Sequence, residues 1–246
     1  MPCVKKDSQK TALVIGAGPA GLSAARELAR IGFAVKVFER SSRAGGLVHL
    51  IPPRRINKDA ILRMAKNLDI TYNTAVDLGE IGALAKKYDA VIIATGTQKN
   101  RSLKNFDTHS DKICFAIDFL EKDIRPKSVA VIGGGDTAID CAIEARERGS
   151  LATVYYRKSR EEMRALKSEV ALAESAGVDF VFNTPPDDLG AFKEDLIVIA
   201  IGQDPDVPEN LPKNVFLCGD AFLGATTVGK AIVHARKIAT EVGNLI

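Results

Sequence analysis

Two glycine-rich turns constrain this chain more than any other feature. Gly16-Ala17-Gly18-Pro19-Ala20-Gly21 follows the apolar run Leu13-Val14-Ile15, and Gly133-Gly134-Gly135-Asp136-Thr137-Ala138 follows Val129–Ile132. The turns are about 117 positions apart, and each precedes a stretch with helical periodicity. A strand, a glycine turn and a helix in this order form a pyrophosphate site, because the glycines admit the anion to the backbone and the helix presents free N–H groups. The sequence therefore predicts two dinucleotide sites.

Short apolar strands alternate with helical segments along nearly the whole chain, which is typical of a parallel α/β sheet. The predicted strands are Ala12–Ile15, Val35–Phe38, Ala90–Ala94, Val129–Ile132, Thr153–Tyr156, Asp179–Phe182, Leu196–Ile201 and Val215–Cys218. The predicted helices are Ala20–Ile31, Ala60–Leu68, Thr137–Arg148, Glu161–Ala173 and Val228–Val242. We therefore expect an α/β fold with parallel sheets.

In the first unit each glycine has its own task. Gly16 permits a tight turn, Gly18 lets the backbone approach a pyrophosphate, and Gly21 lets the helix pack closely on the strand. Pro19 and Ala20 complete the turn. Glu39 ends the next strand, where a carboxylate accepts both ribose hydroxyls of an adenosine. This acid favours a free ribose, as in FAD or NAD.

The second unit has different side chains at its ribose end. Gly133, Gly135 and Ala138 occupy the three small positions, and Asp136 and Thr137 complete the turn. The following strand ends in Arg157-Lys158-Ser159-Arg160 instead of an acid. Basic side chains there suit a 2′-phosphate, so Arg157, Lys158 and Arg160 favour NADPH, with NADH as the open alternative. The competing interpretation is a solvated basic face.

One flavin and one nicotinamide form a pair with a redox function, because a hydride passes between them. That transfer needs no protein acid or base on the nicotinamide side, so we nominate no catalytic residue. His49, His109 and His234 are scattered and are expected to have no catalytic role.

Four isolated cysteines limit the remaining chemistry. Cys3, Cys114, Cys141 and Cys218 form no CxxC pair and no metal-ligand spacing. We therefore expect no metal site, no dithiol pair and no cysteine-ligated cluster. Unpaired thiols favour a reducing cytoplasm, and Cys141 and Cys218 are expected in the core.

Charge and hydropathy exclude two classes of partner. The net charge of +3 is small, and Lys and Arg are spread along the chain, so nothing indicates nucleic acid. The run Thr11–Ala25 is too short and glycine-broken to span a membrane, and no apolar segment of signal-peptide type follows the first ten residues. We expect neither nucleic-acid nor membrane binding.

Motifs over nearly the whole chain resemble flavoproteins with two dinucleotide-binding domains, the glutathione- and thioredoxin-reductase-like superfamily. The likeness is greatest to the small (beta) subunit of NADPH-dependent glutamate synthase and related electron-transfer subunits. The motifs are GAGPAG at Gly16–Gly21, FER at Phe38–Arg40, GGL at Gly45–Leu47, ATG at Ala94–Gly96, GGGDTAIDCA at Gly133–Ala142, YRKSREEM at Tyr156–Met163, AIGQ at Ala200–Gln203 and CGDAF at Cys218–Phe222.

The resemblance implies two nested Rossmann-like domains, with the NADPH domain inserted into the FAD domain. Residues 1–103 and 214–246 would form the FAD-binding domain, and residues 104–213 the NAD(P)H-binding domain. It adds these residues to the cofactor sites: Arg40, Gly46, Leu47, Thr95, Gly96, Gly202, Gly219, Asp220, Thr227 and Val228.

The resemblance also implies an FAD-containing NAD(P)H oxidoreductase of the electron-transfer type. Its electrons would go to an iron–sulfur protein or a larger catalytic subunit. A cysteine-rich N-terminal extension of the glutamate synthase subunits has no counterpart here, and the segment after Gly46 differs, keeping only Pro53-Arg54. Two alternatives remain open: a thioredoxin- or ferredoxin-reductase-like enzyme without a CxxC pair, and a non-catalytic dinucleotide-binding module.

Overall fold

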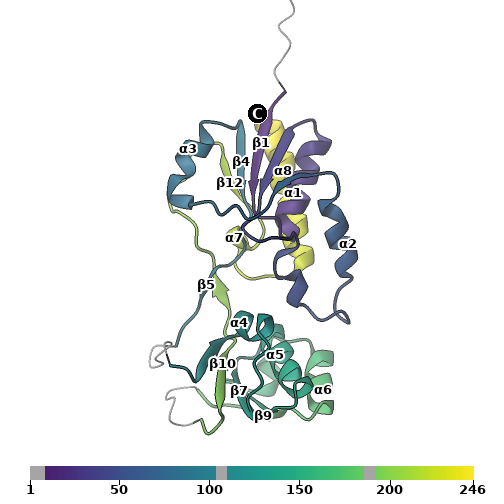
Figure 1. Cartoon of the computed structure of the whole chain (residues 1–246), viewed down its shortest axis with the longest axis vertical. Helices are drawn as coiled ribbons and strands as arrows, with labels where there is room; N and C mark the ends of the chain where they lie inside the picture. Colours follow the sequence, from purple (N-terminus) through teal and green to yellow (C-terminus); the bar gives the residue numbers. More distant parts are fainter. Residues whose placement is uncertain (1–8, 104–109, 186–191) are drawn as a thin grey trace, which may run out of the picture. The chain divides into compact units, whose positions relative to one another are not determined.

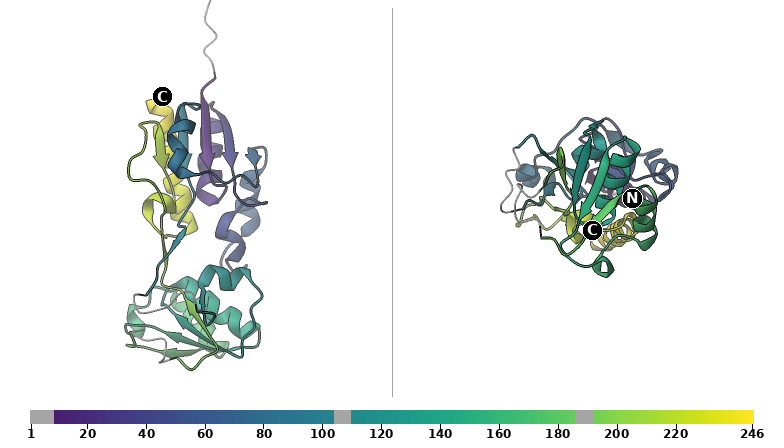
Figure 2. Two further views of the ribbon diagram at one scale, coloured as in Figure 1. Left: turned by 60° about the vertical axis from the view of Figure 1, so that its left-hand side comes forward. Right: turned by 90° about the horizontal axis from the view of Figure 1, so that it is seen from below.

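The computed structural model describes residues 9–103, 110–185 and 192–246. The chain divides into two compact units, Met1–Lys99 with Gln203–Ile246, and Asn100–Gly202 (Figure 1). The second unit is thus inserted between the two segments of the first. Figure 2 shows the purple N-terminal strand and the yellow C-terminal helix in the same unit.

The first unit contains a parallel five-stranded sheet in the order β12-β4-β1-β2-β3. Its strands are β1 (Thr11–Ile15), β2 (Ala34–Phe38), β3 (Asp69–Thr71), β4 (Ala90–Ile93) and β12 (Val215–Leu217). Its helices are α1 (Pro19–Arg30), α2 (Lys58–Leu62), α3 (Ile81–Ala85), α7 (Asp220–Leu223) and α8 (Val228–Leu245), with short 3-10 turns η1 (Gly46–Leu50), η2 (Arg63–Ala65) and η3 (Leu78–Glu80).

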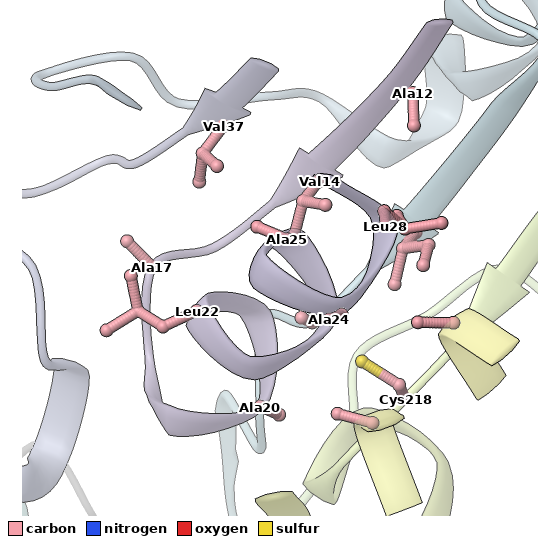
Figure 3. Packing of buried hydrophobic residues seen from close by; sticks show 14 of the residues in the cluster. Ala12, Val14, Ala17, Ala20, Leu22, Ala24, Ala25, Leu28, Val37 and Cys218 are labelled. Carbon is pink, nitrogen blue, oxygen red and sulfur yellow. The ribbon is translucent and has the colours of Figure 1, made fainter. Parts of the chain in front are cut away.

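The alternation of side chains along β1 gives this sheet two buried faces. Ala12 and Val14 pack in one cluster with Leu22 and Leu28 of α1 and with the alanines of α8 (Figure 3). Leu13 and Ile15 point to the opposite face and pack with Ile81 of α3. Burial on both faces explains why the parallel strands read as continuous apolar runs.

The second unit contains a parallel five-stranded sheet in the order β6-β10-β7-β8-β9. Its strands are β6 (Ile113–Phe115), β7 (Ser128–Ile132), β8 (Leu151–Tyr155), β9 (Asp179–Val181) and β10 (Leu196–Ile199). Its helices are α4 (Ala116–Glu121), α5 (Asp136–Glu147) and α6 (Lys167–Ser175), with the 3-10 turn η4 (Arg160–Glu162). The α/β class and the parallel sheets expected from the sequence are confirmed.

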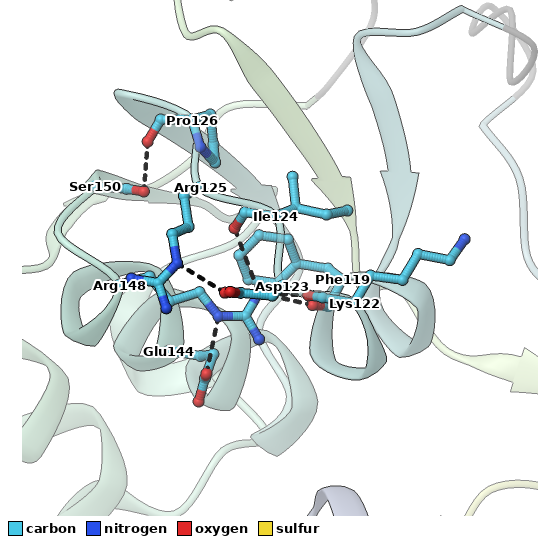
Figure 4. Close-up of polar contacts among 9 residues, drawn as sticks. All are labelled: Phe119, Lys122, Asp123, Ile124, Arg125, Pro126, Glu144, Arg148 and Ser150. Carbon is cyan, nitrogen blue, oxygen red and sulfur yellow. Dashed lines mark hydrogen bonds and ion pairs between the residues drawn. The ribbon is translucent and has the colours of Figure 1, made fainter.

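One arginine fastens α4 to the end of α5. Arg148 Nη1 donates to the carbonyl oxygens of Phe119 and Lys122, both at 2.9 Å, and its Nε donates to Glu144 at 2.9 Å (Figure 4). The guanidinium lies over the Phe119 ring, 4.8 Å from its centroid. The side chain is only 9% exposed, so this ion pair and these hydrogen bonds are largely shielded from water.

A short ladder lies where the chain passes from one unit to the other. β5 (Lys99–Asn100) pairs with β11 (Gln203–Asp204). On one side the Gln98 N–H donates to the Asp204 carbonyl, and on the other the Arg101 N–H donates to the Gly202 carbonyl.

The unit boundaries differ from those expected, 103/104 and 213/214. Residues 203–213 belong to the first unit, because Val207 and Leu211 pack with the Leu13 face of its sheet. Leu103 packs with Ala130 and Ile132 of the second unit, so residues 100–103 belong there. Residues 104–109 lie outside the described residues.

Two predicted helices also differ. The helix expected over 161–173 begins at Lys167, because Ser159 and Glu162 form a reciprocal capping box that closes a separate 3-10 turn. The helix expected over 60–68 is α2 followed by η2. No helix among the described residues has the length and apolarity that a membrane crossing requires.

Candidate functional site: two cofactor cradles

The first glycine turn is shaped by close approaches of backbone. Gly16 has φ +103°, and a Cβ there would lie 2.6 Å from the Ala94 carbonyl oxygen. A Cβ on Gly21 would lie 1.9 Å from the Gly16 carbonyl oxygen. Around Gly18, which caps α1 without a side chain, a Cβ would meet nothing within 4 Å. The turn is therefore closed at its first and third glycines and open at the second, as a pyrophosphate site requires.

Glu39 holds this turn from the end of β2. It is buried, and its two carboxylate oxygens accept the N–H groups of Ala17 at 2.7 Å and Ser41 at 2.8 Å. Each oxygen keeps one lone pair for a further donor. Glu39 can thus order the turn and accept two ribose hydroxyls.

Two unsatisfied polar atoms lie at the carboxyl ends of neighbouring strands. Thr95 follows β4 and Asp220 follows β12, which pairs with β4. The Thr95 Oγ1 and Asp220 Oδ1 atoms are buried and have no hydrogen-bond partner within the part of the chain that the structure describes. Burial raises the pKa of Asp220 to about 6, although the Thr226 N–H acts in the opposite direction. Such orphaned atoms fit a hydroxyl-bearing ligand, such as the ribityl chain of FAD.

Further predicted residues surround the same turn. The Gly45 N–H donates to the Ala17 carbonyl at 2.8 Å, and a Cβ on Gly46 would lie 3.3 Å from the Gly18 Cα. Gly219 is wedged between two helices, because its Cβ would lie 2.4 Å from Ala20 Cβ and 3.6 Å from Ala231 Cβ. The structure thus brings the starts of α1, η1 and α7 together at the carboxyl end of the sheet.

The remaining first-unit candidates are placed as follows. Pro19 begins α1, Thr227 caps α8 by accepting the Lys230 N–H, Val228 begins α8, Gly96 has φ +72°, and Arg40 and Leu47 are exposed.

The second glycine turn repeats this geometry. Gly133 has φ +152°, and its Cβ would lie 2.3 Å from the Ala200 carbonyl oxygen, the counterpart of the Ala94 contact. Gly135 is open and caps α5 without a side chain. Alanine occupies the third small position of this turn. If Gly133 carried a Cβ, that atom would lie 3.1 Å from the Ala138 Cβ. Asp136 accepts the Leu166 N–H at 3.0 Å, and Gly202 has φ +100°.

The basic cluster after β8 is partly neutralised. Lys158 pairs with Glu162 at 2.9 Å, and Arg160 makes a bidentate pair with Glu174. Arg157 is exposed, and no carboxylate within the described ranges pairs with it. Of the three predicted phosphate ligands, Arg157 therefore offers the least compensated charge. Thr137 is exposed at the second position of α5.

Tyr156 lies against the second glycine turn, where a Cβ on Gly134 would lie 2.4 Å from two carbons of its ring, and the sequence reasoning did not single it out. The offset of about 117 positions between the two turns aligns Glu39 with Tyr156 and Arg40 with Arg157. Applying the same offset beyond the glycines would have found it.

Two of the cysteines lie in the hydrophobic core. Cys141 and Cys218 are fully buried, as expected, and burial raises the pKa of the Cys218 thiol to about 12. Within the described residues, no three His, Cys, Asp or Glu side chains are grouped to hold a metal ion.

Comparisons with known proteins are consistent with two dinucleotide-binding turns. A family model described as pyridine nucleotide-disulphide oxidoreductase matches residues 10–215. The chain is 36% identical over 197 residues to a putative glutamate synthase (NADPH) small chain of Cereibacter sphaeroides, covering 70% of this chain and 48% of that one. It is 31% identical over 308 residues to the NADP(+)-dependent formate dehydrogenase subunit beta of Moorella thermoacetica, covering 96% and 44%. The chain thus spans about half the length of these relatives.

Solved structures share the fold. A 2-naphthoyl-CoA reductase complex superposes with a TM-score of 0.78 at 24% identity, covering 95% of this chain and 40% of that one. Lactococcus lactis thioredoxin reductase superposes with a TM-score of 0.69 at 19% identity, covering 96% and 98%.

Proposed function

Because the chain belongs to the pyridine nucleotide-disulphide oxidoreductase family, we propose that its first glycine turn holds FAD and its second holds NADPH. Family membership implies both cofactors and an oxidoreductase. The residue-level assignment is carried by one observation: the first turn has a buried acid, Glu39, at its ribose end, whereas the corresponding place in the second has no acid and is followed by the exposed Arg157.

When bound, NADPH supplies a hydride that FAD accepts. The residues of this chain bind the two cofactors and orient them. Gly18 and Gly135 leave room for the pyrophosphates, and Glu39 accepts ribose hydroxyls. Thr95 and Asp220 supply polar atoms to the flavin side, and Arg157 supplies a cation to the 2′-phosphate.

We propose that the electrons pass to another protein, an iron–sulfur protein or a partner catalytic subunit. Two relatives are named as a small chain and as a subunit beta, which supports a partner-bound role.

The Cys141 and Cys218 thiols are buried and form no disulfide, which supports a location in the reducing cytoplasm.

An anaerobic titration tests this function. The purified protein should show a flavin spectrum that NADPH bleaches, and NADH should bleach it less effectively. A flavin that stays oxidised with both coenzymes would contradict the proposal.

A charge reversal tests the coenzyme assignment. Arg157→Glu should weaken NADPH binding far more than NADH binding, because a charged contact to the 2′-phosphate is lost. Arg125→Glu is the matched control, since it makes the same charge change on an exposed loop of the same unit. Equal losses for both coenzymes with Arg157→Glu would mean that Arg157 does not contact the phosphate.

A further inference from the structure

The residue that follows β2 and the residue that follows β8 have equivalent backbone positions. Ile15 pairs with Phe38, and Ile132 pairs with Tyr155. The next residues, Glu39 and Tyr156, donate their N–H groups to the carbonyl oxygens of Thr71 and Val181, the last residues of β3 and β9.

The equivalence extends past the next strands, β3 and β9. The carbonyls of Glu39 and Tyr156 accept the N–H groups of Thr74 and Thr184. The preceding residues, Asn73 and Asn183, have left-handed φ values of 54° and 55°. Tyr156 therefore occupies the place of the ribose-reading acid.

The side chains at these equivalent places make different contacts with the glycine turns. Glu39 accepts the N–H of Ala17, the second residue of the first turn. Tyr156 lies against Gly134, the second residue of the other turn: a Cβ there would lie 2.4 Å from two carbons of the ring. The Tyr156 hydroxyl donates to the Glu162 carbonyl at 3.0 Å, which holds the ring in this position.

We propose that Gly134 and Tyr156 are a matched pair that sets the coenzyme specificity of the second site, an inference that rests on the proposed function. The phenol replaces a group that accepts two ribose hydroxyls, and its single oxygen already donates to Glu162. It also removes a negative charge that would repel a 2′-phosphate beside Arg157. Gly134 is required because a larger residue would collide with the ring.

The pair can be exchanged for the Ala17–Glu39 pair of the first unit. The variants are Tyr156→Glu, Gly134→Ala and the double variant, with Tyr155→Phe as a neighbouring control that alters a tyrosine bonded to Glu194. Dissociation constants for NADP+ and NAD+ are measured by calorimetry on the FAD-loaded protein, together with melting temperatures.

Tyr156→Glu should weaken NADP+ binding by roughly tenfold or more, through like-charge repulsion, and strengthen NAD+ binding. Gly134→Ala should lower the melting temperature and weaken both coenzymes. In the double variant the alanine should be harmless, so its melting temperature and NAD+ affinity should match or exceed those of Tyr156→Glu. Tyr155→Phe should leave the ratio of the two constants unchanged.

An unchanged NADP+/NAD+ ratio in Tyr156→Glu would overturn the specificity role. Strictly additive losses in the double variant would overturn the matched pair, because they would mean that the ring does not restrict residue 134. If the unaltered protein binds neither coenzyme, the proposed function fails, and this inference fails with it.

Discussion

Asp220 is a half-buried carboxylic acid, and one of its oxygens has no hydrogen-bond partner among the described residues. Its pKa is raised from 3.8 to about 6, so folding favours the protonated form. The stability that this proton contributes is fully present below about pH 4 and is lost as the pH rises through about 6. Asp220, whose unpartnered oxygen can accept a hydrogen bond from FAD, therefore lowers the stability of the FAD-free protein at neutral pH.

Asp220→Asn should stabilise the FAD-free protein at pH 8 by about 1 kcal/mol, after allowance for solvent screening of the half-buried group. The gain should vanish towards pH 4. Thermal unfolding of the stripped protein at both values measures it, and FAD affinity should fall in the same variant. A stability gain that is equal at both pH values would contradict the assigned titration.

His234 stabilises the turn before Asp220 only when it is neutral. Its Nδ1 accepts the Gly219 N–H at 3.2 Å, and its ring stacks on Phe222. Burial and Lys237 lower the pKa of His234, while Glu241 acts in the opposite direction. The contribution is therefore present above the ordinary histidine pKa and is lost as the pH falls through the lowered one.

His234→Asn should keep an acceptor for the Gly219 N–H that does not titrate. Between pH 7 and pH 5 its melting temperature should fall less than that of the unaltered histidine. The comparison is made in the Asp220→Asn background, which removes the opposing titration. His234→Leu, which has no acceptor, should be less stable at both values; equal pH profiles for His234 and His234→Asn would exclude the histidine as the cause.

At the scale of elements, the attachment of α4 to α5 depends on Arg148. Arg148→Met should destabilise the second unit by about 2 kcal/mol, because the carbonyl oxygens of Phe119 and Lys122 lose their charged donor. Arg125→Met removes an exposed pair with Asp123 and should cost less than about 0.5 kcal/mol. The readout is the unfolding transition that NADP+ shifts; equal effects would contradict a structural role for Arg148.

Elements with strong periodicity were predictable, and short ones were not. β1, α1, β7 and α5 were found because a buried parallel strand and an adjoining glycine turn leave clear sequence patterns. The short helices α3 and α4 were missed, since five or six residues are too few to show a helical period. The carboxylate that pairs with Arg160 was also missed, because Glu174 is brought near Arg160 only by the tertiary fold.

At the scale of the whole molecule, each unit has its own buried clusters. The second unit buries Val129 and Val131 on one face of its sheet and Ala130 and Ile132 on the other. Its boundaries could not be placed from sequence, because the apolar residues Val207 and Leu211 give no indication of which sheet they join.

Residues 100–202 expressed alone should therefore fold and bind NADP+ without FAD. Circular dichroism and calorimetry measure the two properties, and the same fragment with Arg157→Glu is the control for specific binding. A fragment with the spectrum of an unfolded chain would show that its two clusters are insufficient for an independent fold.

The ladder between β5 and β11 brings the exit and the return of the chain side by side. The loop-closure entropy of joining two ends rises only slowly with the length of the chain between them, so a long insertion at this position costs the host sheet little. The same junction offers a place to exchange the inserted unit for a homologous one, giving hybrid proteins with a new coenzyme preference.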